Sequence, residues 1–314
     1  MRVTFLQHRS HDVALSIGLG VEMEKSKNKR RLVQIDAALA GPLFMLSASL
    51  LFTLLNLIVK TLNPVFTVWH IGFFRFFGGL VMILIIFGRH HNPFRGNNTR
   101  LLIIRGCVGS VAFISLITAL KLLPLSTALV IFYSFPAFSA VFAYMIYGEK
   151  IGKLEIACIV LVMIGVGTLF DFRLGGTFLG QAMALFGAVF AGLTVTLIRS
   201  LREKNGPVII YLYFCMMGTL VTAPKFIMTP ILPGTPLEWV MVLGIIFTSL
   251  TAQLLMNQGF FYCKGWEGGV YMSSEVIFTG IVGIVFLGDI VTLRFWVGGI
   301  LIFGSVVALN RLKA

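Results

Sequence analysis

Long apolar runs separated by short polar stretches fill most of this chain. Each run is close to 20 residues long and lacks the strict alternation of a barrel strand. About 20 apolar residues in a helix cross a hydrocarbon core about 30 Å thick. The pattern therefore predicts an all-α membrane protein with ten transmembrane helices, at residues 37–59, 65–88, 101–120, 124–147, 154–170, 176–198, 207–228, 239–262, 268–288 and 293–310.

Residues 1–36 form a polar segment that ends in a basic run, Lys25 to Arg31. The apolar patch from Val13 to Val21 is too short to span a bilayer, and it lacks the small-residue cleavage site of a signal peptide. We expect this segment to be cytoplasmic. Met23 is an alternative start of the protein.

Composition supports the membrane assignment, since 58% of residues are hydrophobic and only 12% are charged. Soluble domains are about 25% charged. The net charge of +13 is carried by short loops rather than by a basic stripe, so nucleic-acid binding is not expected. With the N-terminus inside, nineteen Lys and Arg residues fall on cytoplasmic segments, Arg105 among them, and five fall outside. This bias predicts a multi-pass protein of an inner (plasma) membrane with both termini cytoplasmic.

The chain overlays on itself at an offset of 140 residues. Tyr147-Gly148-Glu149-Lys150 falls on Leu287-Gly288-Asp289-Ile290, and Ala48 falls on Ala188. The offset divides the chain into two five-helix repeats, at 37–171 and 176–311. Because each repeat has an odd number of helices, the second inserts upside down, and inverted repeats of this kind surround a central solute site.

These features together resemble the EamA family of the drug/metabolite transporter (DMT) superfamily. The resemblance covers the chain from about residue 40 and rests on the two halves, the glycine-acid turn after the fourth helix of each, and three motifs: Phe74-Arg75-Phe76, the run Ala119 to Ala128, and Tyr147-Gly148-Glu149-Lys150. Asp289 stands where the family often has glutamate. The resemblance implies import or export of metabolites such as amino acids, vitamins or nucleotide derivatives.

Two ionisable residues lie near the middle of predicted spans, Arg75 in the second and Glu275 in the ninth. A charged group at the bilayer centre is costly and usually faces a cavity or a partner. We expect both to face a central cavity and bind a charged substrate. The alternative is a permanent ion pair that holds the halves together. A carboxyl group at this depth is also a candidate proton site, so proton coupling is a second expectation.

Uncharged polar residues inside the spans complete the set of candidate substrate-binding residues. Gln253 and Asn257 are four positions apart and share one helix face. The others are Asn56, Tyr133, Tyr271 and Ser274. Hydrogen bonding across helices is the alternative role for such groups.

Glu149 and Asp289 follow helix ends and precede new helices, where a carboxylate favours the helix N-terminus. We expect both to be structural turn residues, with Glu149 cytoplasmic and Asp289 external. The four cysteines form no CxxC pair, and His90-His91 lies in a polar loop, so neither a metal site nor a cofactor is expected.

The functional expectation is a secondary transporter that moves a small organic metabolite by alternating access. Walker A, HExxH and GxSxG patterns are absent, so an enzyme is not expected. An integral membrane enzyme acting on lipid and a channel for small ions are the alternatives.

Overall fold

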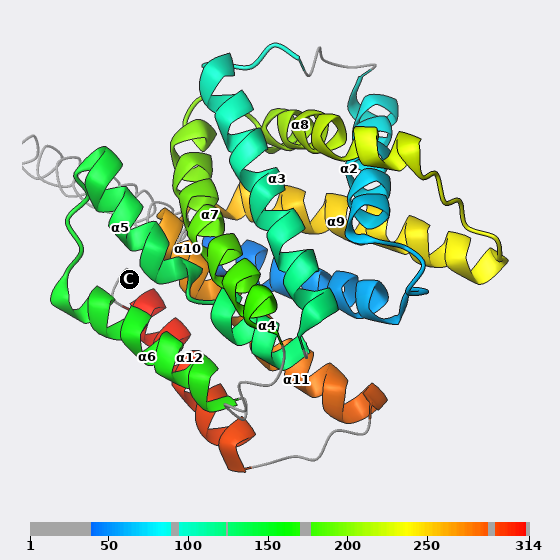
Figure 1. Cartoon of the computed structure of the whole chain (residues 1–314). Helices are drawn as coiled ribbons and strands as arrows, with labels where there is room; N and C mark the ends of the chain where they lie inside the picture. Colours follow the sequence, from blue (N-terminus) through cyan, green and yellow to red (C-terminus); the bar gives the residue numbers. More distant parts are fainter. Residues whose placement is uncertain (1–38, 89–93, 124, 170–176, 288–292, 312–314) are drawn as a thin grey trace, which may run out of the picture.

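The computed structural model describes residues 39–88, 94–123, 125–169, 177–287 and 293–311. The described chain is helical (Figure 1). The first helix runs from Leu39 to Thr61. The later helices are α2 (Val68–Phe87), α3 (Thr99–Leu122), α4 (Leu125–Phe132), α5 (Phe135–Tyr147), α6 (Lys153–Leu169), α7 (Phe178–Arg202), α8 (Pro207–Met228), α9 (Pro236–Gly259), α10 (Gly265–Met272), α11 (Ser274–Leu287) and α12 (Leu293–Arg311).

Six of the described helices are long and apolar enough to cross a membrane: the first helix, α2, α3, α7, α8 and α9. Large apolar side chains also point outward, for example Phe247 on α9 and Phe303 on α12. In water such surface would be unfavourable, whereas in a bilayer it contacts lipid. The protein is therefore a helical, multi-pass membrane protein.

Helices pair across the two halves of the chain. α2 packs on α8 and α9, and α3 packs on α7 and α8. α5 contacts α7 and α10, while α6 pairs with α12 at one side of the molecule (Figure 1). Small residues allow these close approaches. A Cβ at Gly165 of α6 would lie 3.0 Å from the carbonyl oxygen of Gly298 on α12.

Two of the predicted spans are broken near their middle. The segment predicted at 124–147 is α4 followed by α5, and the segment predicted at 268–288 is α10 followed by α11. The first break has a cause in the sequence, because Pro136 lacks the N–H that would bond the carbonyl of Phe132, the last residue of α4.

The second break lies against the first helix. Ser49 Oγ is 3.3 Å from the carbonyl oxygen of Met272, and Thr53 Oγ1 is 3.4 Å from that of Glu275. Each hydroxyl has one proton and is closer to a carbonyl of its own helix, Met45 for Ser49 (3.0 Å) and Ser49 for Thr53 (3.1 Å), so these contacts line the break with polar groups without bonding it exclusively. Both breaks lie beside the cavity described next.

Candidate functional site

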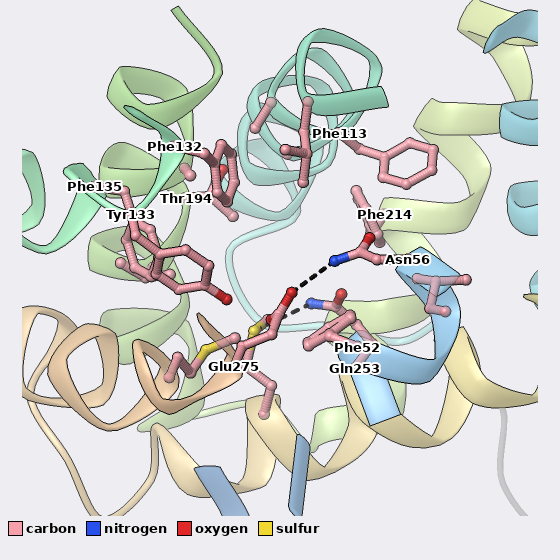
Figure 2. Close-up of a pocket in the computed structure, with 18 of the residues that line it drawn as sticks. Phe52, Asn56, Phe113, Phe132, Tyr133, Phe135, Thr194, Phe214, Gln253 and Glu275 are labelled. Carbon is pink, nitrogen blue, oxygen red and sulfur yellow. Dashed lines mark hydrogen bonds between the residues drawn. The ribbon is translucent and has the colours of Figure 1, made fainter. Parts of the chain in front are cut away.

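A cavity of about 120 Å³ lies at the centre of the helix bundle. Its walls come from the first helix, α2 to α5 and α7 to α11, so both halves of the chain contribute. Most of its lining is apolar and aromatic (Figure 2). The lining residues are Phe52, Leu55, Asn56, Arg75, Arg105, Gly109, Ala112, Phe113, Leu116, Phe132, Tyr133, Phe135, Ala191, Thr194, Val195, Phe214, Gln253, Met256, Met272 and Glu275.

Glu275 presents its carboxyl group to this cavity from the first turn of α11. Asn56 Nδ2 donates a hydrogen bond of 2.7 Å to Glu275 Oε1. The Tyr133 hydroxyl, from the break between α4 and α5, faces the same carboxyl group (Figure 2). An amide donor and a phenol therefore surround the one acidic residue of the cavity wall.

Arg75 reaches the cavity from α2 and is buried. Its Nε donates to Ser249 Oγ at 2.6 Å, and its guanidinium carbon lies 3.8 Å from the centre of the Phe113 ring. A cation over an aromatic face is stabilised by the ring quadrupole. Arg75 and Glu275 thus have different partners, and the structure shows no direct ion pair between these two described residues.

Arg105 corrects the charge count made from the sequence, which assigns it to a cytoplasmic loop. It lies in the second turn of α3, is fully buried and lines the cavity. Its guanidinium carbon is 4.3 Å from the centre of the Phe214 ring. Residue 105 falls inside the predicted span at 101–120, yet its charge is counted there with the preceding loop. In the structure the Asn98 cap starts the helix at Thr99 and sets Arg105 about 9 Å along its axis.

Gln253 is the fifth of the expected residues that line the cavity, with Asn56, Arg75, Tyr133 and Glu275. Its Nε2 lies 3.9 Å from Met256 Sδ, a weak acceptor. The amide is therefore free to take a stronger partner within the cavity.

Three expected residues lie elsewhere. Asn257 shares the face of Gln253 but sits about 6 Å further along α9. There its Nδ2 donates to the carbonyl of Pro207 at 3.2 Å. Tyr271 is buried within α10, and Ser274 is buried where α11 begins. Neither is among the residues that line the cavity.

Glu149 follows the C-terminal cap of α5. Gly148 adopts a left-handed conformation (φ 65°), and the N–H of Glu149 donates to the carbonyl of Ala143 at 3.3 Å. This is the backbone geometry of a helix-ending turn. Asp289 lies outside the described residues. Within the part of the chain that the structure describes, no cluster of three His, Cys, Asp or Glu residues is placed to hold a metal ion.

A membrane-embedded helical bundle around a largely apolar cavity with a few polar and charged groups defines a class, the polytopic membrane proteins with a central cavity. The family within that class is shown by sequence. The model of the EamA-like transporter family matches residues 39–170 and again 178–311, and the chain belongs to this family.

Two relatives are themselves named as carriers or exporters. The pseudopaline exporter CntI of Pseudomonas aeruginosa is 25% identical over 280 residues, covering 89% of this chain and 99% of the relative. The human solute carrier family 35 member G1 is 26% identical over 289 residues, covering 86% of this chain and 77% of the relative. These names indicate a membrane transporter rather than an enzyme.

A protein of known crystal structure shares the fold. It aligns with a TM-score of 0.71 at 18% sequence identity, covering 87% of this chain and 97% of that chain.

Proposed function

We propose that this protein is a secondary transporter that moves a small organic metabolite across the membrane by alternating access. The main support is that both halves of the chain contribute polar residues to one cavity. The first half contributes Asn56, Arg75 and Arg105, and the second contributes Gln253 and Glu275. A site shared between two halves can open to either side when the halves rock against each other.

Ten spans arranged as two inverted repeats are part of this proposal. The helix contacts support it, because corresponding helices of the two halves pair with each other: α2 with α8 and α6 with α12. The contact of α3 with α8 has its counterpart in that of α2 with α9. At an offset of 140 residues, the break at Tyr133 also falls on the break at Ser273. A two-fold relation between the halves accounts for these matches.

We assign the cavity as the substrate site, with Arg75, Glu275, Asn56, Gln253 and Tyr133 as substrate-binding residues. Tyr271, Ser274 and Asn257 lie outside the lining of this cavity. The relative named as a pseudopaline exporter supports export as the direction of transport.

Both termini are proposed to be cytoplasmic, in an inner (plasma) membrane. The end of the bundle at Asn98 would then face the cytoplasm and the end at Gly234 the outside. Single cysteines at these positions in a cysteine-free background test this with a membrane-impermeant maleimide. In intact cells position 234 should label, and position 98 only after permeabilisation. The reverse pattern would refute the orientation.

Reconstitution tests the transport function itself. Untargeted metabolite profiling of cells with and without the gene supplies candidate compounds, which are then offered in labelled form to proteoliposomes. A carrier should give saturable uptake that accelerates when the unlabelled compound is inside, whereas protein-free liposomes should not. Uptake that rises linearly with concentration and ignores internal compound would instead indicate a channel.

A further inference from the structure

Arg105 carries a buried guanidinium whose hydrogen-bonding capacity is unused. Its side chain is 0% exposed, and none of its three nitrogens has a hydrogen-bond partner in the structure. The guanidinium carbon lies 4.3 Å from the centre of the Phe214 ring. This ring provides no lone-pair acceptor, so the five N–H groups of the guanidinium stay without one. Buried charges of this kind are normally paired.

Arg105 and Arg75 converge on the same aromatic ring. The guanidinium carbon of Arg75 is 5.7 Å from the centre of Phe214, compared with 4.3 Å for Arg105. Both residues line the cavity, whose wall includes one acidic residue, Glu275, already bonded to Asn56. The formal charges of the wall therefore leave an excess of at least one positive charge, which an anion would neutralise.

The remaining walls restrict what that anion can be. Phe113, Phe132, Phe135 and Leu116 surround the polar groups with apolar surface. An inorganic anion would gain nothing from this surface, whereas an organic carboxylate would bury its carbon skeleton there. The guanidinium fork also matches the two oxygens of a carboxylate.

We propose that Arg105, with Arg75, binds the carboxylate group of an organic anion, and that this anion is the class of substrate carried. The inference rests on the proposed transport function. The unused donors of Arg105 take their acceptors from the ligand. In the empty protein, Arg105 is accordingly a source of instability.

The first test needs no ligand. Arg105→Met keeps a long, flexible side chain and removes the unpaired charge, so the purified full-length variant should unfold at a higher temperature than the wild type. Arg202→Met is the matched control. Arg202 is also buried, but it donates to the carbonyls of Asn257 (2.9 Å) and Asn205 (2.5 Å) and to Gln258 Oε1 (2.8 Å). Its loss should lower the unfolding temperature. A lower unfolding temperature for Arg105→Met would identify Arg105 as structural and overturn the proposal.

The second test uses matched pairs of a carboxylate and its neutral amide: phenylacetate with phenylacetamide, and glutarate with glutaramide. At millimolar concentration, at least one carboxylate should raise the unfolding temperature of the wild type, while its amide should not. Arg105→Met should weaken that binding at least tenfold, Arg105→Lys should weaken it less, and inorganic phosphate should have no effect. Equal effects of acid and amide, or no effect of any carboxylate, would overturn the inference.

The failure of this inference is distinguishable from failure of the transport function. If Arg105→Met transports the metabolite found by profiling as fast as the wild type, the carrier assignment stands and the carboxylate site falls. If the wild type transports no metabolite, the carrier assignment falls, whatever the anions do to its stability.

Discussion

Asn56 on the first helix donates a hydrogen bond of 2.7 Å to Glu275 on α11, although 219 positions separate the two residues. The bond joins the first half of the chain to the second at the wall of the central cavity. It also positions the carboxyl group beside the break between α10 and α11. Whatever moves the two halves apart must stretch or break this contact.

Replacing Asn56 with leucine should destabilise the protein by about 1–3 kcal/mol, because a buried carboxyl oxygen loses its donor. Thermal or denaturant unfolding of the purified protein measures this. Asn63→Ala is the control, since Asn63 donates to Glu238 at an exposed site and its loss should cost less than about 1 kcal/mol. Equal effects of the two substitutions would argue against a special role for the cavity contact.

Replacing Glu275 with glutamine should reduce transport about tenfold, equivalent to about 1.4 kcal/mol, while the folded protein persists. The glutamine oxygen still accepts from Asn56, so the packing is kept and only the ionisable group is lost. If Glu275 also carries the coupling proton, the remaining transport should no longer respond to an imposed pH gradient. Transport by Glu275→Gln at the wild-type rate would exclude Glu275 from the mechanism.

Asn205 ties the loop before α3 to the turn between α7 and α8. Its Oδ1 accepts from the N–H of Asn97 at 2.7 Å, and its Nδ2 donates to the carbonyl of Asn97 at 3.0 Å. Asn205→Ala should destabilise this end of the bundle by about 1–3 kcal/mol. A cysteine at the cavity residue Thr194, in a cysteine-free background, should then react faster with maleimide from that side. An unchanged rate would show that Asn205 does not help close the cavity.

Gly165→Ala should destabilise the protein by about 1–3 kcal/mol. The new Cβ would lie 2.9 Å from Ile302 Cγ1 and 3.0 Å from the carbonyl oxygen of Gly298, forcing α6 and α12 apart. Gly304→Ala on α12 is the control, because a Cβ there meets nothing within 4 Å, and alanine favours the helix by up to about 1 kcal/mol. Opposite signs of the two unfolding shifts are the expected result.

The sequence predicted the positions of most helices closely. The predicted span at 207–228 matches α8 (Pro207–Met228), and the span at 65–88 contains α2 (Val68–Phe87). The length of an apolar run can be read from the local sequence, because a helix must be apolar over the thickness of the bilayer to cross it. Residues such as Pro207 also indicate where a helix starts. The break after α4 had a visible signal in Pro136. The break after α10 had no such signal, and the polar groups beside it, Ser49 and Thr53, come from a helix more than 200 positions away.

The candidate site was also predictable only in part. The sequence alone identified Arg75 and Glu275 as candidate site residues, because both lie deep within predicted spans and charged residues are rare at that depth of a bilayer. Sequence periodicity grouped Asn257 with Gln253, yet packing puts Asn257 against Pro207 instead of the cavity.

By itself, then, the sequence determined a helical membrane protein of the EamA-like family and two of its buried charges. Only the tertiary structure showed that Arg105 joins Arg75 over Phe214, and that Asn56 meets Glu275. The physical reason is that crossing a bilayer depends on the composition of each segment, whereas a binding cavity depends on which segments, distant in the chain, pack against one another.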